Sequence, residues 1–243
     1  MDCNPDIAQL ALTHGMSEWT YSCLRGRHDL RKTYGRDLGN MPVIAVDVGG
    51  TVEDTWSAKR SWFATKGFDI GRTPIGRREI VKRVGGKEDL YKDMVSDVYS
   101  DAKIASHNLT DGCSEALRLL AMRFRVILLT SRPADQYAIT LEWLGSRGIG
   151  GLIEDLVCVG PSRTKVEWCR AMNASIIVDD DMRHLETIRL EEELRAIHFS
   201  RGAEPTAAMG SAVLSVCTWP DVVTLFGGLM PTAERAESLG VQL

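Results

Sequence analysis

An aspartate stands at the end of an apolar segment in the first quarter of this chain. Residues 43–46 are Val-Ile-Ala-Val, Asp47 follows, and Gly49, Gly50 and Thr51 come directly after it. The apolar run predicts a strand buried on both faces, and the glycines predict a tight turn. A carboxylate placed there can act as a nucleophile, a metal ligand, or both. Asp47 is therefore the first candidate catalytic residue.

Three further polar positions follow predicted elements of the same kind. Thr130 ends the apolar run 125–130, Lys165 opens a predicted helix, and Asp179-Asp180-Asp181 follow the apolar run 175–178. In a parallel sheet, ligands bind at the carboxyl ends of the strands. We therefore expect Asp47, Thr130 and the three aspartates to converge on one site.

Alternation of strands and helices sets the fold class. Strands are predicted at 43–47, 125–130, 156–159, 175–178 and 196–199. Helices are predicted at 114–123, 135–147, 165–172 and 183–194. This order predicts an α/β fold, a three-layer Rossmann-like sandwich with a parallel sheet.

The connection between the first two strong strands is far longer than a usual strand-to-helix loop. We interpret residues 56–106 as an inserted helical cap, with helices at 57–66, 77–84 and 88–100 and a break at Gly85-Gly86. Residues 55–87 hold nine Lys or Arg residues, Arg77 and Arg78 among them, against two acids. A basic cap over a carboxylate-rich site suits an anionic substrate. The alternative is a solvated helical surface.

Residues 1–40 precede the first strand and form a predicted extension. Residues 4–35 have a helical pattern, and Gly35, Gly39 and Pro42 then interrupt it. We expect the extension to pack on the core or on a partner subunit, which would make a homo-oligomer. The core then comprises residues 41–55 and 107–243.

Composition excludes several classes of protein. The chain has 243 residues and a net charge of −4, which gives no basic signal for a nucleic-acid polymer. No apolar run approaches the roughly 20 residues that span a membrane, and the N-terminus lacks a signal-peptide pattern. The six cysteines form no Cys-x-x-Cys motif, which argues against zinc and a disulfide scaffold and favours reduced thiols in a cytoplasmic protein. His107, His184 and His198 show no ligand spacing, so we expect structural histidines.

The four chemical positions in order resemble the haloacid dehalogenase-like (HAD) hydrolase superfamily. That pattern is Asp-x-Asp-Gly-Thr, then a Thr or Ser, then a Lys, then an acidic pair. Leu-Leu-Thr-Ser-Arg-Pro at 128–133, Lys165-Val-Glu-Trp-Cys and Ile177-Val-Asp-Asp resemble motifs of its 5′-nucleotidase-like branch. Val216-Cys-Thr-Trp-Pro-Asp-Val resembles that branch's closing strand and helix. The resemblance covers about residues 43–55 and 107–226.

The resemblance implies a hydrolase that acts on a small phosphorylated metabolite, such as a nucleotide. Asp47 would form an aspartyl-phosphate, and Thr130 and Lys165 would hold the phosphoryl oxygens. The implied Mg²⁺ ligands are Asp47, the Gly49 carbonyl, Asp179 and Asp180. The implied phosphate and substrate contacts are Gly50, Thr51, Ser131, Arg132, Arg77 and Arg78.

Position 49 departs from that pattern. HAD phosphatases have there a second Asp that protonates the leaving group, and Gly49 has no side chain. Either the leaving group needs no proton, or another acid such as Glu53, Asp54 or a cap residue replaces it, or the protein is a degenerate binding or scaffold subunit. These three alternatives stay open.

Two other chemistries share parts of the motif. The phosphonatase branch also has a small residue at the second Asp position and uses a cap lysine. Pro74-Ile-Gly76 resembles its cap motif, but Glu79 stands where that lysine is expected and Lys82 lies one turn further on. Asp47-Val-Gly-Gly-Thr is also written like the phosphate loop of actin-like sugar kinases. Too few residues follow Asp47 for the two lobes of such kinases.

Overall fold

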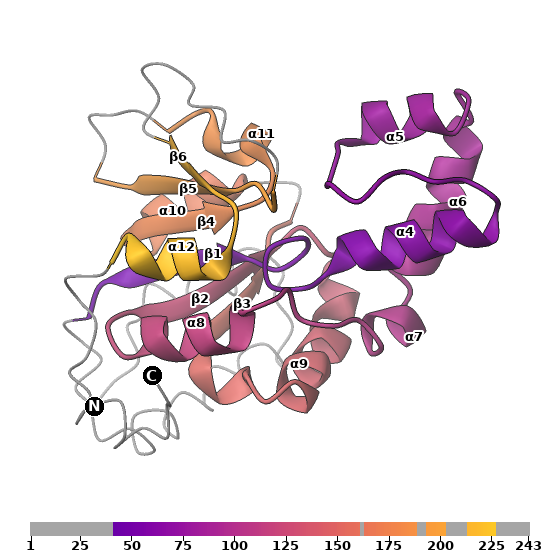
Figure 1. Cartoon of the computed structure of the whole chain (residues 1–243). Coiled ribbons are helices and arrows are strands. Elements are labelled where there is room, and N and C mark those ends of the chain that lie inside the picture. The colour runs from indigo at the N-terminus through magenta and orange to yellow at the C-terminus, as the bar shows by residue number, and fades with distance from the viewer. Residues whose placement is uncertain (1–40, 161–162, 189–192, 203–212, 227–243) are drawn as a thin grey trace. The chain divides into compact units, whose positions relative to one another are not determined.

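A six-stranded parallel sheet forms the centre of the molecule (Figure 1). The computed structural model describes residues 41–160, 163–188, 193–202 and 213–226. The predicted extension 1–40 lies outside these residues. The strands are β1 (Val43–Asp47), β2 (Arg125–Thr130), β3 (Asp155–Cys158), β4 (Ala174–Asp179), β5 (Arg195–Phe199) and β6 (Val213–Val216), in the spatial order β3-β2-β1-β4-β5-β6. β2 and β3 are added on one side of β1 and the last three strands on the other, so the topological switch point lies between β1 and β4, next to Asp47.

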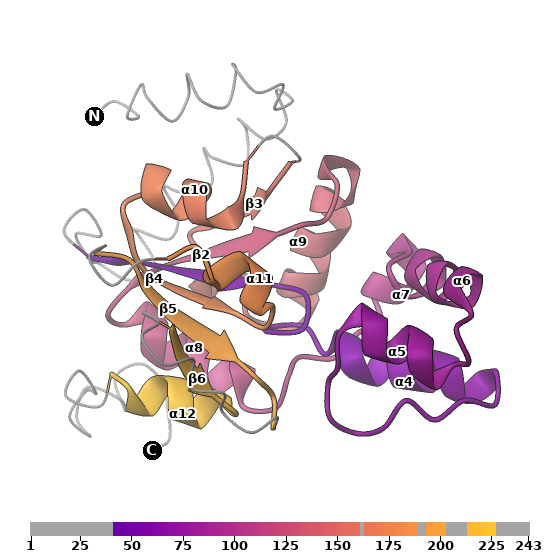
Figure 2. The same cartoon turned by 90° about the horizontal axis from the view of Figure 1, so that it is seen from above.

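Helices cover both faces of this sheet. Helices α8 (Cys113–Ala121) and α12 (Trp219–Thr224) pack together on one face, and α10 (Lys165–Ala171) and α11 (Met182–Leu185) pack on the other (Figure 2). After β2 the chain forms the short turn η2 (Ala134–Gln136), helix α9 (Tyr137–Ser146) and a second turn, η3 (Gly150–Leu152). β1 is buried at every position, as its continuous apolar run predicts for a central strand. The predicted three-layer α/β fold is confirmed.

A helical cap is inserted after β1, as predicted. It contains α4 (Thr55–Thr65), α5 (Arg77–Arg83), α6 (Glu88–Val98) and α7 (Asp101–Ile104). The cap has a small apolar core of its own, formed by Trp56, Phe63, Ile70, Ile80, Val84, Met94 and Val98. Its two linkers run side by side, because the Asp54 N–H donates to the Asn108 carbonyl (2.9 Å) and the Thr110 N–H to the Val52 carbonyl (2.9 Å). The residues after Thr51 thus lead into a helix, whereas a kinase phosphate loop would be followed by a strand hairpin.

One predicted helix differs from the structure, and one strand was not predicted from the apolar pattern. The helix predicted at 183–194 is wrong, because α11 ends at Leu185 and residues 186–188 are not helical; residues 189–192 lie outside the described residues. The apolar spacing there is produced by Leu185, Ile188 and Leu194 packing against the sheet from a short helix and irregular chain. A sixth strand, β6, lies beyond the last strand that the apolar pattern predicts. It is only four residues long and exposes Leu214, so it carries little apolar signal. None of the helices in the described residues is long and apolar enough to cross a bilayer.

Candidate active site

Three carboxylates meet at the carboxyl ends of two neighbouring strands. Asp47 ends β1, Asp179 ends β4, and Asp180 follows Asp179. β1 and β4 pair in parallel, so their ends lie together, and carboxylate oxygens of the three residues lie within 4.8 Å of one another. Asp47 is 4% exposed and Asp179 is fully buried, while Asp180 is half-buried. The expected convergence of these residues is found.

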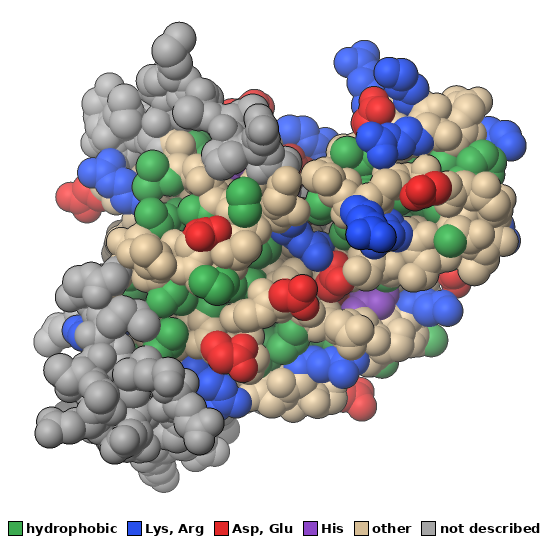
Figure 3. Space-filling model, viewed as in Figure 1, with side chains coloured by type: hydrophobic (Ala, Val, Ile, Leu, Met, Phe, Trp, Pro, Cys, Tyr) green, Lys and Arg blue, Asp and Glu red, His purple; other side chains and the backbone are tan. Residues whose placement is uncertain are grey.

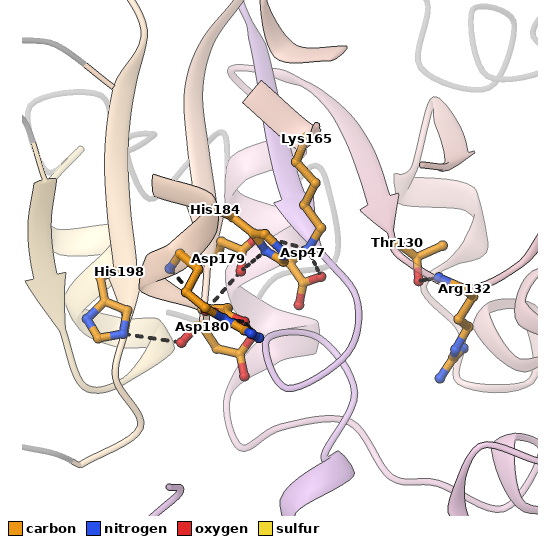
Figure 4. A network of polar contacts seen from close by, with 10 residues as sticks. Asp47, Thr130, Arg132, Lys165, Asp179, Asp180, His184 and His198 are labelled. Atoms are coloured by element: carbon orange, nitrogen blue, oxygen red, sulfur yellow. Dashed lines mark hydrogen bonds and ion pairs between the residues drawn. The ribbon is translucent and has the colours of Figure 1, made fainter. Parts of the chain in front are cut away.

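The Lys165 ammonium lies between two of these carboxylates (Figure 4). Lys165 opens α10, whose start is fixed by a capping box between Thr164 and Glu167. Its Nζ donates to Asp179 Oδ2 at 2.8 Å and to Asp47 Oδ1. Because only 3% of its side chain is exposed, this contact is a buried ion pair. The lysine thus offsets part of the negative charge at the strand ends.

Burial and mutual repulsion govern the pKa values in this cluster. Burial raises the pKa of Asp47 to about 6; the Lys165 ammonium opposes that rise, and the Asp179 carboxylate adds to it. The pKa of Lys165 is raised, since Asp47 and Asp179 together outweigh burial. The pKa of Asp179 is lowered, because Lys165 and His184 outweigh burial. Burial, then Asp47 and Asp179, raise the pKa of Asp180 well above its ordinary value.

The cluster has the donor set of a hard divalent cation. Asp47 Oδ2 is buried and has no hydrogen-bond partner among the described residues. Asp180 is near two other carboxylates without an ion pair of its own among the residues that the structure describes. Mg²⁺ prefers oxygen ligands. The cluster opens into a cavity between the core and the cap, and Gly49, which offers its backbone carbonyl, lines that cavity. The unpartnered Asp47 Oδ2 beside the Asp180 carboxylate, which Asp47 and Asp179 repel, fits the predicted Mg²⁺.

The two adjacent glycines of the turn have different surroundings. Gly50 has φ +105°, and a Cβ there would stand 2.1 Å from Asp180 Oδ2, so both its conformation and its space require glycine. A Cβ on Gly49 would meet only Thr55 Cγ2, at 4.0 Å. Position 49 therefore has room for a Cβ atom, and position 50 has none.

Gly50 and Thr51 form hydrogen bonds within the turn and with the linker that returns from the cap. The Gly50 N–H donates to the Glu53 carbonyl at 3.0 Å. Thr51 is fully buried, and its carbonyl accepts a hydrogen bond from Thr110 Oγ1 at 2.6 Å. Neither residue lines the cavity. Their predicted phosphate contacts stay predictions, while these bonds give both residues a part in holding the turn.

The end of β2 supplies a second wall of the site. Thr130 is 2% exposed, lines the cavity, and accepts the Arg132 N–H on its Oγ1 at 3.2 Å. Ser131 is exposed and also lines the cavity. The Arg132 side chain is buried, with Nη1 donating to Thr140 Oγ1 at 3.1 Å and Nη2 paired with Glu53. Arg132 thus borders the cavity with its guanidinium already held by protein groups.

Both acids near the turn that could replace the missing Asp are held elsewhere. Glu53 is fully buried, pairs with Arg132, and contacts His107 Nδ1 at 2.7 Å. Burial would raise the pKa of Glu53, but the contacts with His107 and Arg132 lower it below its ordinary value. Asp54 caps α4 by accepting the Ser57 N–H at 3.2 Å and pairs with Arg201 Nη2 at 2.6 Å. Neither acid lines the cavity above Asp47.

A cavity of about 1120 Å³ joins the carboxylate cluster to the cap. Its core side includes Asp47, Gly49, Thr130, Lys165 and Asp180, and its cap side includes Arg77 and Arg78, whose predicted substrate contacts stay predictions. Both arginines are exposed, and Arg77 pairs with Glu88 at 2.8 Å. Lys and Arg side chains gather on the cap around α5 (Figure 3), where Arg77, Arg78, Lys82 and Arg83 stand. The cap thus presents positive charge near the negative cluster.

The cavity also contains residues that the sequence did not indicate as part of a site. They include Lys59, Tyr91 and Tyr99 from the cap and Arg201 from the core, together with His184 and His198, which were expected to be structural. Lys59 belongs to the same helical face as the buried Trp56 and Phe63, three residues after one and four before the other. Arg60 has the equivalent spacing, four residues after Trp56 and three before Phe63, so spacing alone does not show which of the two faces the cavity. His184 Nδ1 contacts Asp179 Oδ2 at 3.1 Å, and His198 Nε2 contacts the Asp180 carbonyl at 3.2 Å, so both histidines buttress the acidic pair.

The two cap positions considered for phosphonatase chemistry are outside this cavity. Glu79 forms ion pairs with Arg83 at 3.3 Å and Lys82 at 3.9 Å on the surface of α5. The Lys82 side chain is 80% exposed, and neither residue lines the cavity. The geometry therefore offers no support for a reactive lysine at either position.

Comparison with known proteins finds similarity in three dimensions only. No protein-family model matches the sequence, and no curated protein matches it. Solved structures do match. A haloacid dehalogenase-like family hydrolase from Streptococcus pneumoniae aligns with a TM-score of 0.51 at 13% identity, over 76% of this chain and 98% of that one. The fold is that of the HAD-like hydrolases.

Two further solved structures show the same fold. A haloacid dehalogenase-like protein of unknown function from Agrobacterium tumefaciens aligns with a TM-score of 0.52 at 14% identity, over 78% of this chain and 99% of that one. A HAD family hydrolase from Deinococcus radiodurans, with bound phosphate and sodium, aligns with a TM-score of 0.50 at 13% identity, over 79% and 99%. At such identities the likeness establishes the HAD-like fold, and the chemistry depends on the site's own residues.

Proposed function

We propose that this protein is a Mg²⁺-dependent hydrolase of a small phosphorylated metabolite. The observation that carries the proposal is the cluster of Asp47, Asp179 and Asp180 around Lys165, at strand ends that open into a cavity with a basic cap. A carboxylate held at a strand end beside a cation and a hydroxyl has the parts needed for phosphoryl transfer. The bound phosphate in the Deinococcus structure supports this reading of the fold.

Each residue has a role that its position permits. The Asp47 carboxylate attacks phosphorus and forms an aspartyl-phosphate, while the P–O bond to the leaving group breaks with its electron pair on the leaving oxygen. Lys165 and the Thr130 hydroxyl stabilise charge on the phosphoryl oxygens. Asp47, Asp179, Asp180 and the Gly49 carbonyl would hold the metal. When bound, Mg²⁺ would reduce the repulsion between Asp47 and the phosphate.

The test is a screen of phosphorylated metabolites, nucleotides included, with Mg²⁺ and with EDTA. We expect phosphate release from a subset of the panel that requires Mg²⁺ and is lost in Asp47→Asn. Asp111→Asn, at an exposed position outside the cavity, is the matched control and should behave like wild type. Turnover that survives Asp47→Asn would contradict the proposed nucleophile. The sugar kinase alternative predicts ATP-dependent phosphorylation of a sugar, which we expect to be absent.

A catalytically degenerate binding protein is the second candidate. The observation that favours it is the lack of a general acid near the turn. Gly49 has no side chain, Glu53 pairs with Arg132, and Asp54 contacts Ser57 and Arg201. This candidate predicts Asp180-dependent binding of Mg²⁺ and phosphometabolites without turnover, and phosphatase activity only after Gly49→Asp. Calorimetric binding alongside the same screen separates the two candidates.

A further inference from the structure

Most cations that line the cavity are already paired with a carboxylate. The pairs are Arg132 with Glu53, Lys165 with Asp47 and Asp179, Arg77 with Glu88, Arg183 with Asp181, and Arg201 with Asp54. Among the Lys and Arg residues of the described chain that line it, Lys59 and Arg78 make no such pair. Arg78 is exposed, whereas Lys59 is half-buried. Lys59 is thus an enclosed positive charge without a neutralising carboxylate.

Lys59 sits where the cap meets the catalytic turn. It belongs to α4, the first helix after Gly49, and its Nζ lies 5.6 Å from the centroid of the Tyr99 ring. The same cavity touches Lys59, Asp47 and Gly49. Because Lys59 makes no ion pair with a carboxylate in the described chain, its ammonium stays available to an incoming anion. Although burial opposes it, contact with Tyr99 and the charge of Asp180 raise the pKa of Lys59, so the ammonium keeps its proton at neutral pH.

We propose that Lys59 stabilises the charge on the leaving-group oxygen, at the step for which Gly49 offers no acid. This inference rests on the proposed phosphatase function. An Asp47 oxygen bonds to phosphorus, the bond from phosphorus to the leaving oxygen breaks, and its electron pair stays on that oxygen. Lys59 offsets this charge electrostatically, and water then protonates the released oxygen. For this role Lys59 must hold its positive charge close to the leaving group. It does not need to donate a proton.

The dependence of kcat on the leaving group tests this role. Wild type, Lys59→Met, Lys59→Arg and Lys66→Met are assayed with Mg²⁺ on p-nitrophenyl, phenyl and simple alkyl phosphates. Lys66 is the matched control, since its Nζ lies 5.4 Å from the Trp62 ring at the end of the same helix but outside this cavity. We expect Lys59→Met to lower kcat on the alkyl ester about 10²-fold, the usual effect of removing one such stabilising group. On the p-nitrophenyl ester, whose leaving oxygen needs little stabilisation, the expected loss is less than about threefold. Lys59→Arg, which keeps the charge, should recover part of the loss, and Lys66→Met should match wild type.

Two results would overturn the inference, and they can be told apart. An equal loss across all esters, or a change in KM alone, would mean that Lys59 only binds substrate or packs. Absence of Asp47-dependent turnover of every ester by wild type would overturn the proposed function, and this inference with it. Thermal unfolding of each variant shows whether a loss reflects the fold.

Discussion

On one side of the cavity, the sheet side, Asp47, Asp179 and Asp180 stand where β1 and β4 end and surround Lys165. The other side, around position 49, is where HAD phosphatases have their general acid; we call it the acid side, and Gly49 has no side chain there. The nearby acids differ in the same way. Asp47 and Asp180 face the cavity and repel each other, while Glu53 and Asp54 are neutralised by Arg132 and Arg201. Repulsion between carboxylates is thus concentrated at Asp47 and Asp180, whereas Glu53 and Asp54 each have an arginine partner. Under the proposed function, the sheet side would carry out phosphoryl attack, and the leaving group would need a stabilising group other than an acid at position 49.

The largest expected effect is on the sheet side, with Lys165→Met. Removing the cation leaves the buried Asp47 and Asp179 carboxylates unpaired beside Asp180, so the free energy of unfolding in EDTA should fall by about 3–5 kcal/mol. Saturating Mg²⁺ should restore part of that loss by replacing the missing charge. Urea unfolding with and without Mg²⁺ measures both. Lys103→Met changes an exposed lysine outside the cavity, and as the control it should unfold like wild type. If Lys165→Met also unfolded like wild type in EDTA, Lys165 would not offset the charge of the three carboxylates.

Glu53→Gln tests whether the acid side is structural. The change leaves the buried Arg132 guanidinium without its carboxylate, which should lower stability by about 3 kcal/mol. Because folding lowers the pKa of Glu53, its contribution is fully present above its ordinary pKa of 4.5 and is lost as pH falls through the lowered value. The wild type should therefore lose stability more steeply than Glu53→Gln below that pH. Measured where both proteins are folded, kcat should stay within about threefold, whereas loss of a general acid costs about 10²-fold or more.

The two glycines allow a paired test of the acid side. Gly49→Asp fills open space, and it should raise kcat on alkyl phosphates by about 10²-fold, the lower range of general acid catalysis. Gly50→Ala meets Asp180 at 2.1 Å in a left-handed conformation, so it should lower stability by about 1–2 kcal/mol and weaken Mg²⁺ binding. Steady-state kinetics and calorimetric Mg²⁺ titration of both variants provide the measurements. If both variants changed kcat and Mg²⁺ binding to the same extent, positions 49 and 50 would not differ in the space they offer a side chain.

The sequence predicted the sheet side of the site better than the acid side. Asp47, Thr130 and Asp179 end apolar runs, and apolar runs of buried parallel strands are easily read, so their convergence followed from topology. The engagement of Glu53 with Arg132 and His107 joins residues far apart in the chain, and no local pattern encodes it. The phosphate contacts expected of Gly50 and Thr51 depended on the direction of their N–H groups, which a motif does not specify. Lys59 was one of nine basic residues in its segment, and Arg60 has an equivalent helical spacing from Trp56 and Phe63, so no sequence pattern singled out Lys59.

Asp54 gives the smallest and most discriminating test of the comparison. Asp54→Ala removes the α4 cap and the pair with Arg201, and it should lower the free energy of unfolding by about 1–2 kcal/mol. Asp54→Asn should lose less, because asparagine caps a helix about as well as aspartate and only the pair with Arg201 is lost. Chemical denaturation of both variants separates the cap from the ion pair. If Asp54 were the missing acid, Asp54→Asn would slow alkyl phosphate hydrolysis as strongly as Asp54→Ala and spare p-nitrophenyl phosphate. Since Asp54 is held by Ser57 and Arg201 outside the main cavity, we expect the two variants to differ in stability and to share the wild-type dependence of kcat on the leaving group.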